Sequence, residues 1–297
     1  MSQSNNNLNA INSGRLILSD RIFKVCFGLI LAFYAILLIG MLAADGFYLI
    51  DGAKAGENPI LEAISQPEIQ NSIYLSLISC SLSAFLSIIV AIPTGYILAN
   101  SDFKGKQLLD STLDIPIVLP PLVVGISLLI MFQFPPFTVA LSKIFPFFGI
   151  EGDKTLNEWV VYQVPAVILA QFTVAAAFAI RTLKVSFEQI DGRHEQVALT
   201  LGCSRFQAFY RVVLPQAAPG IVTAWTLAWA RSLGEFGPLL IFAGATRNKT
   251  EVLSTTVFLE MSIGNLQSAV AVSIIMVAVA FVVLMIARIF GKRGVLI

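Results

Sequence analysis

Arg231 and Glu235 are the two residues whose types and spacing first suggest chemistry. They stand four positions apart in the apolar stretch ARSLGEFGPLLIFAG, and residues at this spacing share one face of a helix. A charge at membrane depth costs at least ~2.5–3.5 kcal/mol, so such side chains usually face a bundle interior or a water-filled path. Two interpretations remain open. The residues form an internal ion pair, or they line a path or gate where Arg231 attracts a passing anion.

A polar segment at residues 191–215, DGRHEQVALTLGCSRFQAFYRVVLP, is the second candidate site. We expect Asp191 to cap a short helix and Gly202 to end it in the left-handed conformation. Ser204 then caps a second helix, Gln207 completes a capping box, and Pro215 closes the segment.

This segment mixes basic and apolar side chains, so one face can fill a hydrophobic groove while its rim stays charged. The basic residues are Arg193, Arg205 and Arg211, and the apolar ones are Leu199, Leu201, Phe206, Phe209 and Tyr210. The alternative is an ordinary surface hairpin between two membrane helices.

The composition is that of an integral membrane protein in a lipid bilayer. Hydrophobic residues make up 57% of the 297 residues, charged residues 12%, and the mean hydropathy is +0.82, whereas soluble domains are about 25% charged. A net charge of +1 without a basic patch predicts no nucleic-acid partner. The single His194 has no second ligand nearby, and the three cysteines have no paired spacing, so neither a metal site nor a catalytic site is predicted.

Six apolar segments are long enough to cross roughly 30 Å of hydrocarbon. They lie at about 22–44, 72–99, 111–133, 159–182, 218–244 and 267–290. The first exceeds the about 7–15 residues of a signal-peptide core, so we expect it to be retained. Residues 1–21 are predicted to form a polar, disordered cytoplasmic tail, and residues 22–297 to form the membrane domain. Pro93, Pro116, Pro120 and Pro121 kink their spans, either for bundle packing or in a flexing, pore-lining helix.

The distribution of Lys and Arg predicts the orientation. With the N-terminus inside, thirteen of the 19 basic residues lie on the cytoplasmic side and five outside, while Arg231 lies within a span. The cytoplasmic residues are Arg15, Arg21, Lys24, Lys104, Lys106, Arg181, Lys184, Arg193, Arg205, Arg211, Arg288, Lys292 and Arg293; the outer residues are Lys54, Lys143, Lys154, Arg247 and Lys249. Both termini and the segment 191–215 are therefore predicted to be cytoplasmic.

The segment 191–215 resembles the "EAA" loop of bacterial ABC-importer permeases, in which Glu-Ala-Ala is followed by Gly and later by Ile-x-Leu-Pro. Ala198, Gly202, Leu214 and Pro215 match this pattern at the right distances, Gln196 stands where the family has Glu, and Glu195 lies one position earlier. In that family the loop is a coupling helix seated in a cleft of the cytoplasmic ATPase. The resemblance therefore implies an ATPase-coupling role for these residues and for Phe206.

The stretch after Arg231 resembles the "Arg-x-x-Gly-Glu-Phe/Tyr-Gly … Ala-Gly" segment of the sulfate, molybdate and tungstate branch of these permeases. The matching residues are Arg231, Gly234, Glu235, Phe236, Gly237, Ala243 and Gly244. The resemblance covers about residues 70–290 and implies a tetrahedral oxyanion as substrate, without separating molybdate, tungstate and sulfate. It also makes Arg231, Gly234, Glu235 and Gly237 candidates for the translocation path or gate.

The expected fold is an all-α membrane protein with six transmembrane helices, like a type I ABC-importer permease. The chain has no Gly-x-x-x-x-Gly-Lys-[Ser/Thr] loop, so ATP and Mg²⁺ are expected on a partner ATPase dimer, with no cofactor in this chain and no catalytic activity of its own. A second permease subunit, identical or related, and an extracytoplasmic substrate-binding protein complete the implied assembly.

Three other functions remain open. A permease for iron, a polyamine or a phosphonate would share the same loop. A secondary transporter would show internal repeats or broken helices with acidic residues at mid-membrane, and here only Glu235 qualifies. A polytopic membrane enzyme would need convergent catalytic groups, but the sequence has one His and no Gly-x-Ser-x-Gly.

Overall fold

The computed structural model describes residues 2–52, 59–142 and 156–293, and every regular element in these ranges is a helix. This confirms the predicted all-α class. The chain divides into two compact units: the first contains only α1 (Ser2–Gly52), and the second contains all later helices. Four helices are long and apolar enough to cross a membrane. The number rises to six if two bent pairs each count as one span: Lys106–Val118 with Pro121–Gln133, and Arg205–Gln216 with Ala218–Leu233.

The helix α1 contains the first candidate span, Phe23–Asp51. It begins at Ser2, so the helix includes most of the polar segment 1–21, for which disorder was predicted. A helix already nucleated in an apolar run gains one hydrogen bond for each residue added, which favours its extension into polar neighbours. The first span was predicted to end at residue 44, but α1 continues to Gly52.

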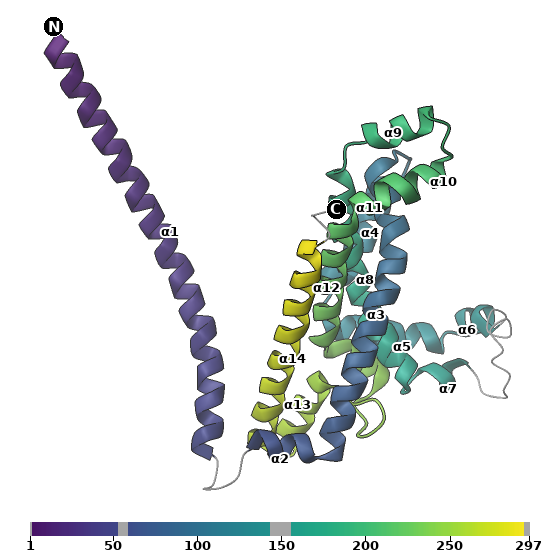
Figure 1. Ribbon diagram of the computed structural model, residues 1–297. Coiled ribbons are helices and arrows are strands. Elements are labelled where there is room, and N and C mark those ends of the chain that lie inside the picture. The colour runs from purple at the N-terminus through teal and green to yellow at the C-terminus, as the bar shows by residue number, and fades with distance from the viewer. Residues whose placement is uncertain (1, 53–58, 143–155, 294–297) are drawn as a thin grey trace. The chain divides into compact units, whose positions relative to one another are not determined.

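Four long helices form the bundle of the second unit: α3 (Pro67–Asn100), α8 (Val164–Glu188), α12 (Ala218–Leu233) and α14 (Leu266–Arg293). The helices α3 and α8 pack on each other and on α12, which also contacts α14 (Figure 1). Small side chains permit this close approach. The buried serines of α3 are Ser72, Ser76, Ser79, Ser83 and Ser87, and half of the buried residues of α8 are alanines. A Cβ atom at Gly95 would lie 3.0 Å from the backbone nitrogen of Lys184.

Hydrogen bonds from the buried serines connect α3 to its neighbours. Ser83 Oγ donates to the carbonyl of Ile168 over 3.0 Å, and Ser76 Oγ accepts the backbone N–H of Leu253 over 2.8 Å. Leu253 begins α13 (Leu253–Ser262), a helix that the hydropathy pattern did not predict because ten residues are too few to span a bilayer. Gly264, with φ +84°, makes the turn into α14.

Two predicted spans are broken instead of continuous. The predicted span 111–133 is divided into α4 (Lys106–Val118) and α5 (Pro121–Gln133), which are bent by 111°. Pro120 and Pro121 cause the break, because proline lacks an N–H group and excludes the α conformation from the residue before it. The predicted span 218–244 ends as an α-helix at Leu233, and a single π turn, η3 (Leu239–Ala243), follows a non-helical stretch.

Short helices lie between the long ones: α2 (Pro59–Ser65), α6 (Pro135–Ser142) and α7 (Leu156–Val160). The helix α7 overlaps the predicted start of the fourth span, because α8 begins only at Val164. Lys54, Lys143 and Lys154, which were counted as outer residues, lie outside the described parts of the chain. In Figure 1, α2 and α13 lie at one end of the bundle, and α9 and α10 lie at the other. The polar segment 191–215 therefore forms one end of the second unit.

Candidate functional site

Two short helices and a glycine turn form the polar loop, as predicted. The first helix is α9 (Arg193–Thr200), and Asp191 Oδ1 accepts the backbone N–H of Arg193 over 3.0 Å at its start. Gly202 follows with φ +90°. The N–H groups of Gly202 and Cys203 donate to the carbonyls of Leu199 and Ala198, which is the Schellman arrangement of a helix C-terminus. The left-handed turn at Gly202 is confirmed.

The second helix, α10 (Arg205–Ala208), begins with the predicted capping box. The backbone N–H of Gln207 donates to Ser204 Oγ over 3.2 Å, and the N–H of Ser204 donates to Gln207 Oε1 over 2.9 Å. Each side chain thus satisfies a backbone donor that the first turn of a helix leaves free.

Pro215 lies inside the second helical segment, which ends one residue later than predicted, at Gln216. The helix continues through a π turn, η2 (Phe209–Val213), and through α11 (Leu214–Gln216), with the N–H of Leu214 donated to the carbonyl of Phe209. Because Pro215 has no N–H group for the carbonyl four residues before it, the wider turn accommodates the proline without ending the helix. The change of direction, 69°, comes between this helical segment and α12.

Four apolar side chains of the loop are exposed, and we call them the loop patch: Val197, Leu201, Phe206 and Tyr210. Leu201 is 80% exposed and Phe206 is 75% exposed. The rings of Phe206 and Tyr210 are stacked, with 6.3 Å between their centroids. Ala198 is buried and Gln196 is exposed, while Leu199 and Phe209, expected on the same apolar face, are half-buried. The loop thus exposes apolar side chains from both of its helices at the end of the bundle.

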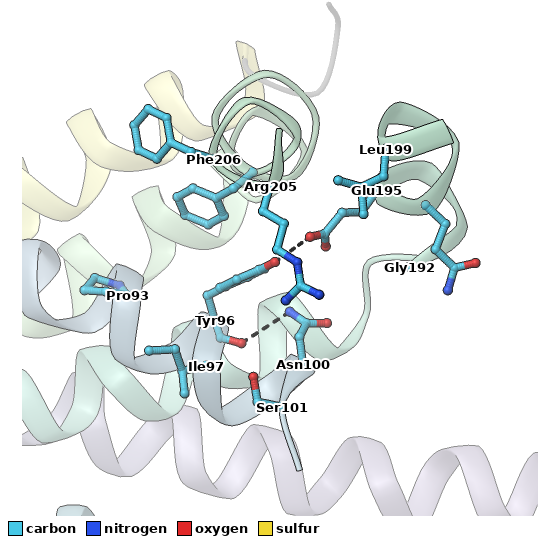
Figure 2. Close-up of a pocket in the computed structure, with 12 residues that line it drawn as sticks. Pro93, Tyr96, Ile97, Asn100, Ser101, Gly192, Glu195, Leu199, Arg205 and Phe206 are labelled. Carbon is cyan, nitrogen blue, oxygen red and sulfur yellow. Dashed lines mark hydrogen bonds between the residues drawn. The ribbon is translucent and has the colours of Figure 1, made fainter. Parts of the chain in front are cut away.

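A pocket of about 580 Å³ separates the loop from the end of α3 (Figure 2). Glu195 lines it and accepts a hydrogen bond from the Tyr96 hydroxyl over 2.6 Å. The sequence grouped Glu195 with the ATPase-coupling residues, but its carboxylate is directed at the bundle. No sequence signal singled out Tyr96, because one tyrosine in an apolar helix has no distinctive neighbours.

Arg231 and Glu235 are in contact, with 3.1 Å between Arg231 Nη2 and Glu235 Oε2. They do not share a helical face, because α12 ends at Leu233 and Glu235 follows that end. The pair lies one length of α12, 16 residues or ~24 Å, from the polar loop that precedes this helix. Loop and pair are therefore two separate sites joined by one helix.

The burial of the two charges is unequal. The Glu235 side chain is 1% exposed, whereas the Arg231 side chain is 31% exposed and lies over the ring of Phe178, 5.6 Å from its centroid. Neither carboxylate oxygen of Glu235 accepts a hydrogen bond from any residue in the described ranges. Arg231 also lies in the last turn of α12, where the helix dipole favours a cation. Loss of Arg231 would therefore leave the buried Glu235 carboxylate without a charged partner, whereas loss of Glu235 would leave Arg231 partly exposed and in contact with the Phe178 ring.

The two broken spans contact each other next to this pair. A Cβ atom at Gly237 would lie 2.7 Å from the Cβ of Pro121, and one at Gly125 would lie 2.8 Å from the Cα of Pro238. Gly237, which follows the end of α12, thus contacts the first residue of α5, and Gly125 within α5 contacts Pro238 of the other broken span. Gly234 has no such close neighbour, since the nearest atoms to its Cβ position are 3.8 Å away. Of the two glycines predicted for the path, only Gly237 makes a close approach.

The described part of the chain thus combines long apolar helices, two broken spans and a structured polar loop at one end. Residues 91–294 match the family model described as "Binding-protein-dependent transport system inner membrane component". The chain belongs to this family, and it is therefore an inner-membrane permease component of the ABC-transporter class. The matched region includes the polar loop and both charged residues, and it begins after α1.

Curated relatives carry names of oxyanion transport systems. The chain is 32% identical over 236 residues to the "Molybdenum transport system permease protein ModB" of Escherichia coli K12, covering 78% of this chain and 98% of that protein. It is 33% identical over 184 residues to the "Molybdate/tungstate transport system permease protein WtpB" of Pyrococcus abyssi, covering 62% and 64%. The "Sulfate transport system permease protein CysT" of E. coli K12 is 29% identical over 223 residues, covering 75% and 76%.

Solved structures show the same fold. A bacterial ABC transporter involved in the import of the acidic polysaccharide alginate aligns with a TM-score of 0.70 and 18% identity, covering 92% of this chain and 95% of that chain. The alginate transporter in complex with an alginate pentasaccharide-bound periplasmic protein aligns with a TM-score of 0.72 and 17% identity, covering 93% and 96%. At this identity the likeness concerns the fold alone.

Proposed function

We propose that this chain is the transmembrane subunit of an ABC importer that moves a tetrahedral oxyanion of the molybdate, tungstate and sulfate class. The permease class follows from the family. The proposal adds the substrate class, a partner ATPase as the energy source, and the residues that transmit the movement of the ATPase to the permease. The observation that carries the coupling role is the loop patch, four exposed apolar side chains on a pair of capped helices at the end of the bundle.

The energy source is proposed to be a partner ATPase that binds ATP and Mg²⁺. The chain has no phosphate-binding Gly-x-x-x-x-Gly-Lys-[Ser/Thr] loop. An exposed apolar surface beside polar residues marks a protein-binding site. The loop patch is exposed, and the same loop carries the exposed basic residues Arg193 and Arg211. These apolar and basic side chains together suit a groove in a soluble subunit.

The substrate class rests on the names of the curated relatives and on the Arg231 site. Arg231 remains partly exposed at the end of α12, beside a break in the bundle, and its guanidinium group is always charged. Unwound segments next to helix ends are where transporters commonly bind charged solutes. A tetrahedral dianion is therefore attracted toward this position, and Gly237 lets the two breaks approach each other there.

A second permease subunit is proposed because the first break is exposed. Val118, directly before the break, is 81% exposed, and Leu119 and Leu122 are also exposed. Non-helical backbone at membrane depth is tolerated only where protein or a water-filled cavity covers it. A second, identical or related, subunit against this face would supply the cover and would enclose a path between the two copies.

The orientation is proposed from the basic residues, with the loop and both termini in the cytoplasm and a substrate-binding protein on the outer side. In Figure 1, α14 ends toward the same end of the bundle as α9 and α10. This arrangement supports a common side for the C-terminus and the loop, consistent with the positive-inside rule.

The function can be tested by uptake in proteoliposomes that contain this permease, its ATPase and its binding protein. We expect ATP-dependent uptake of radiolabelled molybdate or sulfate, and no uptake with a catalytically inactive ATPase. Alginate oligosaccharide and putrescine serve as control solutes. Uptake of an oxyanion without the ATPase would indicate a secondary transporter, and uptake of a control solute alone would contradict the substrate class.

Replacement of Gly202 tests the loop as the coupling element. The φ of +90° is strained for a β-branched residue, while the Cβ position meets no atom within 4 Å. Gly202→Val is thus expected to distort the turn by backbone strain alone, about 1–3 kcal/mol, and Gly202→Asn, which tolerates the left-handed region, is the matched control. We expect the Val variant to remain in the membrane but to lose substrate-stimulated ATP hydrolysis, which the Asn variant retains. Unchanged stimulation in Gly202→Val would exclude this loop from coupling.

A further inference from the structure

One hydrogen bond links the polar loop to a helix far away in the sequence. The Tyr96 hydroxyl, at the end of α3, donates to Glu195 Oε1 in α9 over 2.6 Å. Figure 2 shows the two side chains directed at each other across the pocket, with Arg205 and Asn100 beside them. The acceptor is a carboxylate, and hydrogen bonds to charged groups are about twice as strong as neutral ones.

The Tyr96 ring is held in place by two other aromatic rings. It lies 4.7 Å from the ring of Phe209 in η2 and 5.8 Å, edge to face, from the ring of Phe187 at the end of α8. Phe187 is 1% exposed, so it belongs to the core of the bundle. Tyr96 therefore contacts three elements besides its own, and its hydroxyl is presented to Glu195 by a rigid aromatic cluster.

The helix α3 is suited to receive a displacement from the loop. It packs along α8, α12 and α13, and its Ser76 holds the start of α13. The start of α13 in turn contacts the break next to Arg231, since Ser254 Oγ donates to the carbonyl of Glu235 over 2.6 Å. If α9 moves and α3 moves with it, the movement can reach the break next to Arg231 through the contacts of Ser76 with Leu253 and of Ser254 with Glu235.

We propose that Tyr96 is a positioning residue that connects the loop to α3 through Glu195, and that Glu195 acts inside the permease instead of binding the ATPase. This inference rests on the proposed function, because it gives the route by which the loop transmits the work of the ATPase. The loop patch makes the contact with the partner, and the Tyr96–Glu195 hydrogen bond carries the resulting movement to α3.

The test distinguishes a role in passing movement from the loop to α3 from a role in binding the ATPase. Tyr96→Phe removes the hydroxyl and keeps the ring, Glu195→Ala removes the acceptor, and Glu195→Gln retains an acceptor oxygen. In nanodiscs with the partner ATPase, we measure the affinity for the ATPase, the basal ATP hydrolysis and its stimulation by binding protein loaded with molybdate or sulfate. Tyr74→Phe removes an exposed hydroxyl near the other end of α3 and is the matched control.

We expect Tyr96→Phe and Glu195→Ala each to lower the stimulation about 10-fold, the scale of one hydrogen bond to a charged group. The affinity for the ATPase should change by no more than about twofold. Glu195→Gln should retain most of the stimulation, and the double variant Tyr96→Phe/Glu195→Ala should be no worse than Glu195→Ala, because both changes remove the same interaction.

Full stimulation in Tyr96→Phe would overturn the inference, as would additive losses in the double variant. A loss of ATPase affinity equal to the loss of stimulation would also overturn it, because Glu195 would then belong to the contact with the partner. These outcomes differ from failure of the proposed function, in which the wild-type permease itself would show no ATP-dependent uptake of either oxyanion.

Discussion

Replacement of Arg231 by Met is expected to cause a large loss of folded protein. The change leaves the Glu235 carboxylate 1% exposed, without the cation 3.1 Å away. Removing one partner of a buried ion pair typically costs about 3–5 kcal/mol. Glu235→Gln should be milder, because Arg231 is 31% exposed and retains the ring of Phe178. The measurements are the monodisperse yield after detergent extraction and the thermal unfolding midpoint.

The double change Arg231→Met/Glu235→Gln distinguishes the two roles of the pair. Removal of both charges eliminates the stranded carboxylate, so the yield should recover to near the wild-type level. We expect oxyanion uptake to remain lost, since the cation that attracts the dianion is absent. Additive losses of yield in the double variant would contradict the ion-pair interpretation. Full uptake by the folded double variant would remove Arg231 from any role with substrate.

Addition of one methyl group at Gly237 is the second change with a large expected effect. The new Cβ would lie 2.7 Å from Pro121 Cβ and 2.9 Å from the backbone nitrogen of Leu122. Backbone and a proline ring cannot rotate aside, so the two breaks must separate. Overpacking of this kind costs about 1–3 kcal/mol and occasionally more. We expect Gly237→Ala to lower the unfolding midpoint and to abolish uptake in the protein that folds.

Gly234→Ala is the matched control for this prediction. Gly234 lies three residues earlier in the same stretch, its φ is −81°, and the nearest atoms to its Cβ position are 3.8 and 4.0 Å away, an ordinary contact distance. It should fold and transport like the wild type. Gly125→Ala adds a methyl group on the other side of the contact between the two broken spans, 2.8 Å from Pro238 Cα, and should resemble Gly237→Ala. Equal behaviour of Gly234→Ala and Gly237→Ala would show that the breaks are not closely packed in the membrane.

Local chemistry explains what could be predicted about the loop from the sequence. The turn at Gly202 and the capping box of Ser204 and Gln207 join residues within five positions of one another, so residue type and spacing were sufficient to predict them. The all-α class and the approximate positions of the four long apolar helices followed from hydropathy, because a bilayer requires long apolar helices whatever the rest of the chain does.

The remaining features were decided by contacts between distant residues. Tyr96 and Glu195 are 99 positions apart, and no local pattern could pair them. The helix α12 ends at Leu233 and not at residue 244, the predicted end of this span, and the stretch that follows packs closely against Pro121 and Leu122 of another broken span. The proximity of Arg231 and Glu235 was predicted on the assumption of a continuous helix, and they meet around its end instead. Thus the sequence by itself determined the helical class, the loop turn with its caps, and the break at Pro120 and Pro121. The tertiary packing decided how the two broken spans meet and which side chains connect the loop to the bundle.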